Sequence, residues 1–294
     1  MKVELISHTQ MPYDVVADAA GVCYSSKDIH EFMRNTTDTK KINLIKKLED
    51  SKHESPFEHV SFTFAISGIS RACSHQLVRH RLASYSQRSQ RYVSEHGFGY
   101  VVPPEIKKNK YLRLYYDNCM DEISIMYELL KYNMVIQKIR EYRIDQGIDI
   151  EKYTKEITNI EDGEKIAAEF KNENPTLLNI FMKEAAEDAR FVLPNACETQ
   201  LIMTMNVRSL WNFFNLRCCN RAQWEIRELA WKMRYILVSR YPYLFIHSGP
   251  DCLNGACKEG DKSCGHPYVT SYLYSDDGTC LREQYIDMVR ESEE

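Results

Sequence analysis

An alternation of strand-like and helix-like segments along the chain constrains the fold most. Residues 60–66, VSFTFAI, place Phe62 and Phe64 at alternating positions, and residues 198–206, ETQLIMTMN, alternate in the same way. This pattern is typical of strands with one buried face. Residues 3–7, VELIS, add a short opening strand. These segments predict one sheet.

Helical spacing of apolar residues dominates the rest of the chain. It covers residues 13–24, 36–53, 67–81, 108–145, 176–194, 207–217 and 222–242. A helix-rich alternation with strands predicts an α/β (α+β) fold, a single domain with a central, mostly antiparallel sheet flanked by helices. The segment 108–145 is the long helical part of this domain.

Two segments fall outside the alternating pattern. Residues 145–174 are charged and poorly patterned and end in NENP, so we expect an exposed excursion. Residues 246–294 begin with a Gly- and Cys-rich run that resembles neither a helix nor a strand. The predicted organisation is therefore a domain over residues 1–245 and a Cys-rich extension over residues 246–294.

Composition excludes several classes of protein. The 294-residue chain has a net charge of −4, which argues against a protein that coats nucleic acid or a membrane by bulk charge. No apolar run reaches the roughly 18 residues of a membrane helix. The ten cysteines are scattered along the chain, as is usual for reduced thiols. We expect a soluble, cytoplasmic protein with no membrane or nucleic-acid partner.

Positive charge nevertheless gathers in residues 79–92, RHRLASYSQRSQRY, which hold four arginines, one histidine and no acidic residue. The planar arginine fork donates two parallel hydrogen bonds to a phosphate and keeps its charge. Serines and glutamines between the arginines supply groups that can read a base edge. These are the parts of a site for a nucleotide.

Three other interpretations are compatible with such a stretch. A charged segment often only faces water. Arginines and tyrosines also bind single-stranded DNA or RNA, which would make the chain a binding module with steep salt dependence. A nucleotide hydrolase is less favoured because no paired carboxylates or metal ligands accompany the arginines.

The motif Arg-His-Arg, seven residues, Ser is formed by Arg79, His80, Arg81 and Ser89. Three further blocks occur in a fixed order around it, HESPFEHVSFTF, RFVLP and MNVRSLWNFFNLR. Together they resemble the family of flavin-dependent thymidylate synthases. The resemblance covers roughly residues 1–105 and 175–245.

This resemblance implies an α/β fold in a homotetramer with active sites between subunits. It implies bound FAD and the conversion of dUMP to dTMP, with methylenetetrahydrofolate as carbon donor and NADPH as reductant. The implied flavin contacts are His53, Ser55, Glu58, Arg79, His80, Arg81, Asn206, Val207, Arg208 and Asn212. The implied dUMP contacts are Gln76, Arg79, Gln87, Arg88, Ser89, Gln90, Arg91, Arg190 and Arg217.

The resemblance assigns catalytic roles to Arg217 and Ser89. Arg217 would stabilise negative charge on the pyrimidine, as an oxyanion hole does elsewhere. Ser89 would donate a hydrogen bond, because no base that could activate it is evident. Cys197, in LPNAC, invites the role of a nucleophile, but nothing nearby suggests a lowered thiol pKa. We therefore expect no cysteine nucleophile.

Other positions depart from the family or lie outside it. Gln87 stands where relatives often have Glu, and Cys23 where some relatives carry a serine near the flavin. In the extension, Cys252, Cys257, Cys264 and His266 have the spacing C-x4-C-x6-C-x-H. Structural zinc usually takes two close pairs, so this irregular spacing favours free thiols over a metal, and we assign no metal ligand.

Overall fold

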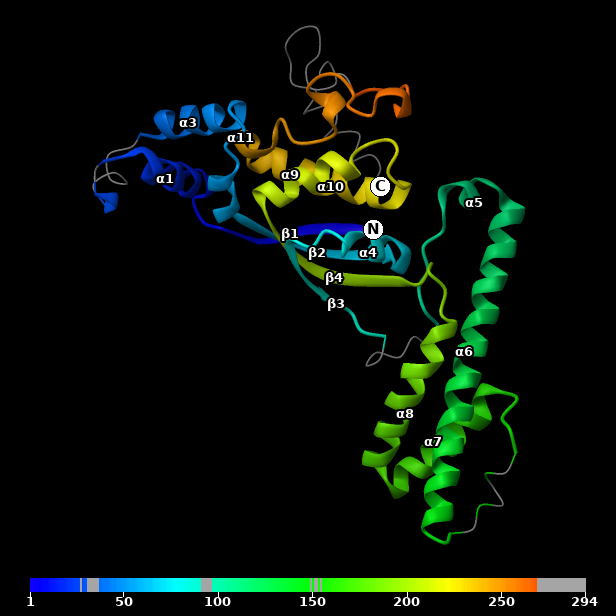
Figure 1. Cartoon of the computed structure of the whole chain (residues 1–294). Helices are drawn as coiled ribbons and strands as arrows, with labels where there is room; N and C mark the ends of the chain where they lie inside the picture. The colour runs from blue at the N-terminus through cyan, green and yellow to red at the C-terminus, as the bar shows by residue number, and fades with distance from the viewer. Residues whose placement is uncertain are drawn as a thin grey trace. The chain divides into compact units, whose positions relative to one another are not determined.

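The computed structural model describes residues 1–26, 28–30, 37–90, 97–148, 150, 153 and 155–268. The described residues fall into two compact units (Figure 1). Unit 1 contains those of Met1–Ser67, His75–Ser86 and Leu201–Glu294, and unit 2 those of Gly68–Ser74 and Gln87–Gln200. No helix among these residues is both long and apolar enough to cross a membrane.

Four antiparallel strands form one sheet, as predicted. In the order β1-β2-β4-β3 they span Lys2–His8, Ser61–Ser70, Glu198–Asn206 and Ala83–Gln87. Leu5 of β1 lies opposite Phe64 of β2, and a bulge follows Leu5. The sequence pattern missed β3, because ASYSQ has no alternating large apolar residues. The hydroxyl of Tyr85 holds β3 in place by donating to the carbonyls of Leu77 and His80, both at 2.9 Å.

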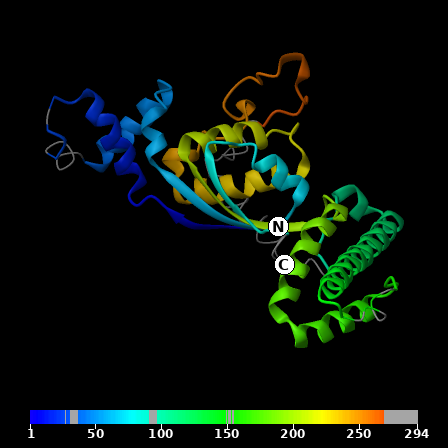
Figure 2. The ribbon, with the colours of Figure 1, turned by 60° about the horizontal axis from the view of Figure 1, so that its bottom comes forward.

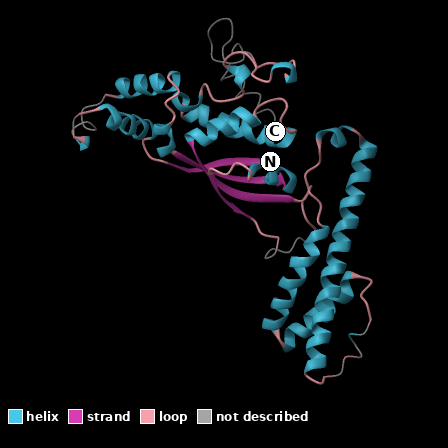
Figure 3. Cartoon of the chain, in the orientation of Figure 1, coloured by secondary structure: helices cyan, strands magenta, loops and turns pink. Residues whose placement is uncertain are grey.

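The core of unit 1 lies between the sheet and helices α9 (Val207–Arg217) and α10 (Trp224–Arg240), which run along one face of the sheet (Figure 3). The alternating residues of the two central strands supply the sheet side: Phe62, Phe64 and Ile66 from β2, and Leu201, Met203 and Met205 from β4. The other helices with residues in unit 1 are α1 (Pro12–Tyr24), α3 (Asp38–Asp50), the end of α4 (Arg71–Leu77) and α11 (Pro242–Phe245). Every second residue of the two central strands is thus buried, which explains why one face of the sheet packs against the helices.

In unit 2, helices α6 (Lys110–Asp145), α7 (Ile160–Glu173) and α8 (Pro175–Ala189) lie side by side (Figure 2). The prediction of an exposed excursion over residues 145–174 was wrong for α7. Ala167 and Phe170 are buried against Ile136, Ile139 and their neighbours on α6 and α8. The charged residues of α7 hide a narrow apolar face, which is why the pattern was missed.

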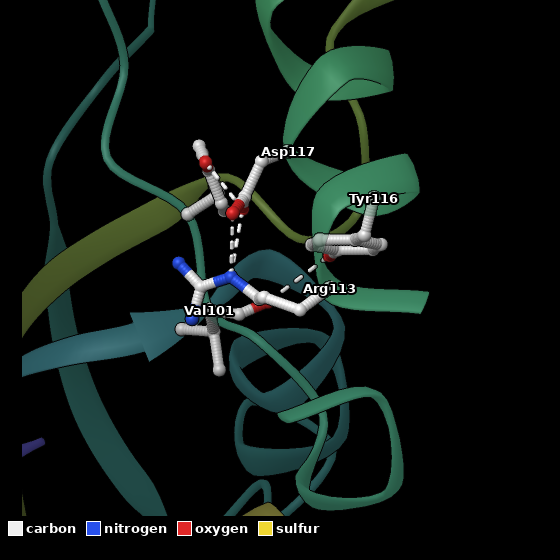
Figure 4. A network of polar contacts seen from close by, with 5 residues as sticks. Val101, Arg113, Tyr116 and Asp117 are labelled. Atoms are coloured by element: carbon white, nitrogen blue, oxygen red, sulfur yellow. Dashed lines mark hydrogen bonds and ion pairs between the residues drawn. The ribbon is translucent and has the colours of Figure 1, made fainter. Parts of the chain in front are cut away.

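The beginning of α6 is fixed by capping and by a polar network. Asn109 accepts hydrogen bonds from the backbone N–H groups of residues 111 and 112. Arg113 pairs with Asp117, which also accepts from the Tyr100 hydroxyl at 2.7 Å. The Tyr116 hydroxyl donates to the carbonyl of Val101 (Figure 4). These bonds hold residues 100–101 against α6. The short helix α5 (Pro104–Lys108) lies between the two in the sequence.

The packing of α7 on α6 requires a glycine. A Cβ atom at Gly163 would lie 2.7 Å from both Cβ and Cγ of Tyr132. We expect Gly163→Ala to lower the free energy of unfolding by about 1–3 kcal/mol, because a well-packed core resists an added methyl group. Urea denaturation measures the change. Gly255→Ala, where the added methyl meets open space, is the control, and equal effects of the two substitutions would contradict the argument.

Helix α3 ends in a strained residue. Lys52 has φ 57°, and the N–H of His53 bonds to the carbonyl of Leu48 at 2.9 Å. This left-handed position after a helix is usually glycine. We expect Lys52→Gly to raise the free energy of unfolding by about 0.5–1 kcal/mol, measured by urea denaturation. Lys47→Gly, inside α3, should lower it by about the same amount; a loss at both positions would rule out the strain.

Candidate functional site

A cleft of about 1490 Å³ lies in unit 1. Its lining comes from the end of α3, from Glu54 and Glu58, from residues 79–82 after α4, from the β4–α9 junction and the rest of α9, and from residues 247–258. The structure brings together most of the predicted flavin contacts here: Glu58, Arg79, His80, Arg81, Asn206, Arg208 and Asn212. Arg217, predicted to contact dUMP, lines the same cleft.

The β4–α9 junction positions the polar residues of the helix. Asn206 ends β4 and caps α9, because its side chain accepts from the N–H of Ser209 at 2.8 Å. Arg208 and Asn212, four residues apart, therefore share one face of α9. Val207 is fully buried and does not line the cleft, so its flavin contact stays a prediction.

Arg208 lies between two carboxylates. Its Nε donates to Glu54 at 3.0 Å, and its Nη1 donates to Glu58. The hydrogen bond to Glu58 and the two negative charges raise the pKa of Arg208. His53 and Ser55, on either side of Glu54, do not line the cleft. Sequence reasoning missed Glu54, although it stands within the HESPFEH block.

Arg217 is held by a neutral histidine. Its Nε donates to Nε2 of His80 at 3.0 Å, and the His80 ring meets the ring of Phe213 edge to face, with centroids 4.9 Å apart. Burial, and then the charge of Arg217, lower the pKa of His80 to about 4. An imidazole must be neutral to accept this bond, so His80 orients the guanidinium instead of repelling it.

The cleft has cations that lack a counter-ion. Within the described part of the chain, no carboxylate pairs with Arg79, Arg81 or Arg217, whereas Arg208 and Lys258 are paired. Glu49 also lines the cleft, and burial and the charge of Asp50 raise its pKa to about 7. The arginines without a carboxylate partner suit an anionic ligand.

The predicted dUMP contacts divide between the units. Gln76, Arg79 and Arg217 belong to unit 1, and Gln87, Arg88, Ser89, Gln90 and Arg190 to unit 2. Arg91 lies outside the described residues.

Within unit 2 the Gln87 amide donates to Ser74 at 2.9 Å and to Thr199 at 3.2 Å, so an amide fulfils a fixed hydrogen-bonding role at this position. Gln90 lies against the sulfur of Cys197, at 3.6 Å. Arg190 donates to the carbonyl of Glu187 at 3.0 Å, which folds its side chain back along α8.

No disulfide joins the cysteines in the described part of the chain. Cys23 is exposed on α1 and does not line the cleft. No group of three metal-ligating side chains gathers among the described residues, Cys252, Cys257, Cys264 and His266 included.

Residues 247–258 are a further part of the cleft that the sequence did not predict. They follow the last block of the family resemblance, and their Gly- and Cys-rich sequence gives no sign of a partner surface. Only the structure brings them to α9, where Asn215 donates to Asp251 at 2.9 Å.

Comparison with known proteins establishes the family. Residues 4–243 match the family model described as thymidylate synthase complementing protein. A flavin-dependent thymidylate synthase of Clostridium tetani is 42% identical over 274 residues, which are 93% of this chain and 97% of the relative. One of Geobacter sulfurreducens is 40% identical over 276 residues, 93% of this chain and 98% of the relative. The chain belongs to the flavin-dependent thymidylate synthases, a family of methyltransferases, and the resemblance is confirmed.

A solved structure has the same fold. The flavin-dependent thymidylate synthase of Helicobacter pylori, complexed with FAD and dUMP, matches with a TM-score of 0.50 at 23% identity. The match covers 85% of this chain and all of that one. The predicted fold class is confirmed.

The depressed pKa of His80 makes stability depend on pH. The unfolded chain protonates this residue below about pH 6.5, whereas the folded chain does so only near pH 4. Its contribution to stability is therefore complete above pH 6.5 and is lost as the pH falls toward 4. We expect the melting temperature of His80→Gln, relative to that of the unchanged protein, to be higher at pH 5 than at pH 8.

Glu49→Gln is the control of opposite sign. The raised pKa of Glu49 gives stability at low pH that is lost as the pH rises through about 7. The melting temperature of this variant, relative to that of the unchanged protein, should therefore be higher at pH 8 than at pH 5. If the difference in melting temperature between His80→Gln and the unchanged protein is the same at both pH values, His80 is not held neutral.

Proposed function

We propose that this chain makes dTMP from dUMP, with 5,10-methylenetetrahydrofolate as carbon donor and NADPH as reductant through bound FAD. The observation that carries the proposal is the gathering of most of the predicted flavin contacts, and of Arg217, in one cleft. FAD would supply the transfer of reducing equivalents. The family membership supports the same reaction.

The residues fit a dinucleotide cofactor. FAD has a diphosphate, and Arg79 and Arg81 are cleft cations with no carboxylate partner among the described residues. Asn206 and Asn212 line the same cleft and offer amide groups to a ring system or a ribose. We assign flavin binding to these residues together with His53, Ser55, Glu58, His80, Val207 and Arg208.

Arg217 is the residue that we propose to stabilise the reacting base. Its Nε is used by His80, while its two terminal nitrogens make no hydrogen bond to the described residues. They are available to donate to a uracil carbonyl oxygen, where negative charge develops when C5 becomes nucleophilic. A guanidinium already oriented by a neutral partner loses little entropy on binding.

A cysteine nucleophile is not needed in this mechanism. Cys197 is fully buried, and burial raises the pKa of Cys218 to about 12, so neither offers an accessible thiolate. Ser89 would donate a hydrogen bond to dUMP. Gln76, Arg79, Gln87, Arg88, Gln90, Arg91 and Arg190 would hold the nucleotide, the arginines through its phosphate.

We extend the proposal to assembly and location. The family resemblance suggests a homotetramer with active sites at subunit interfaces, and the absence of disulfides among the described cysteines suits a reducing cytoplasm. We propose no nucleic-acid or membrane partner. An arginine site for a single nucleotide accounts for the basic stretch without either.

Release of tritium from the C5 position of labelled dUMP tests the reaction. With NADPH, methylenetetrahydrofolate and FAD present, we expect tritium release with dTMP as product, and none without FAD. A folded protein that binds FAD and releases no tritium would contradict the proposed chemistry. A protein that takes up no FAD would instead favour the interpretation as a nucleic-acid binding module.

The role of Arg217 is tested by substitution. Arg217→Ala should lower the turnover number about 10²–10³-fold, the usual loss for one charge-stabilising donor, while FAD affinity changes little. Arg240→Ala removes an exposed arginine from the last turn of α10 and should leave both unchanged. Equal losses of turnover and of FAD affinity in Arg217→Ala would contradict the proposed role.

A further inference from the structure

The cleft has one side that comes from the Cys-rich extension. Residues 247–258, here named the C-terminal wall, follow the segment matched by the family model, which ends at residue 243. His247, Asp251, Asn254, Gly255 and Lys258 of this wall all line the cleft. Part of the site is thus built by a segment to which the family motifs assign no role.

The wall is anchored to α10. Arg234 is only 5% exposed, and its guanidinium donates to the carbonyls of Ser248 at 2.6 Å and Ile246 at 3.0 Å. Gly249, with φ 135°, passes so close that a Cβ atom would lie 3.0 Å from Leu253. Leu253 itself is 3% exposed. A buried arginine, a buried leucine and a required glycine indicate a folded wall and not a loose tail.

The wall is also joined to α9, the helix that carries Arg208, Asn212 and Arg217. Asn215 donates to the carbonyl of Gly249 at 3.3 Å and to the carboxylate of Asp251 at 2.9 Å. Asp251 in turn pairs with Lys258 at 2.6 Å. The wall therefore holds a cleft-lining lysine, whose ammonium group pairs with a carboxylate that also accepts a hydrogen bond from the Asn215 amide.

We propose that the C-terminal wall binds the diphosphate of FAD through Lys258, whose ammonium group leaves Asp251 for the phosphate oxygens. This inference rests on the proposed function, because it assigns part of the flavin site. Lys258 is mostly exposed, with 77% of its side chain accessible, so its movement costs little. Asn215 continues to satisfy Asp251 after the lysine has moved.

Three variants of the full-length protein test this contact. FAD is titrated into apoprotein, and flavin fluorescence gives the Kd. Lys258→Ala should raise the Kd about five- to twentyfold, as expected for the loss of a charge-assisted hydrogen bond. Lys262→Ala removes an exposed lysine of the same extension that does not line the cleft, and should leave the Kd unchanged.

Asp251→Asn separates binding by Lys258 from simple support of the wall. The new amide oxygen still accepts from Asn215, while the competing charge is gone, so we expect the Kd for FAD to be equal to or lower than that of the unchanged protein. Equal weakening by Asp251→Asn and Lys258→Ala would overturn the proposal, because both would then act through the shape of the wall.

Other outcomes are equally decisive. A Kd for FAD within twofold of the unchanged protein in Lys258→Ala would overturn the contact, and a raised KM for NADPH or methylenetetrahydrofolate in that variant would assign Lys258 to a co-substrate instead. Failure of the unchanged protein to bind FAD would overturn the proposed function together with this inference. Normal FAD binding by the unchanged protein, with loss only in Lys258→Ala, supports both.

Discussion

The connection between β4 and α9 is the constraint on which the site depends. Met205 is buried under the helices, Asn206 caps α9, and the N–H of Val207 bonds to the carbonyl of Val60 at 2.9 Å. Three consecutive residues thus fix strand, cap and helix at once. Because a helix is stiff, this junction determines where Arg208, Asn212 and Arg217 lie, although they are spread over nearly three turns.

Charges in the cleft are handled in two different ways. Arg208 is neutralised by two carboxylates, so its position is fixed before any ligand arrives. Arg217 instead uses a neutral histidine, which fixes the guanidinium and leaves its charge uncompensated. The reaction proposed above would use both arrangements, because a paired arginine exerts a weaker electrostatic field on a new anion.

The sequence predicted the elements whose apolar periodicity is strong. Strands β1, β2 and β4 and the long helix α6 all follow from their patterns. It failed where tertiary contacts decide the structure. Strand β3 depends on the bonds of Tyr85, and α7 depends on a narrow apolar face ending in Phe170. The helix expected over residues 67–81 ends at Leu77, so that Arg79 and His80 lie beyond it and reach the cleft.

The same division applies to the site. The family pattern marks residues such as Arg79, His80 and Arg208 as candidates, and the structure brings them into one cleft. The C-terminal wall has no such mark, since backbone carbonyls make most of its anchoring bonds, and any sequence supplies carbonyls. What identifies it is the set of donors that meet those carbonyls, the buried Arg234 and Asn215. Both donors stand on helices within the matched family region, whereas the segment that they hold lies beyond it, so the extension completes a cleft that the family region begins.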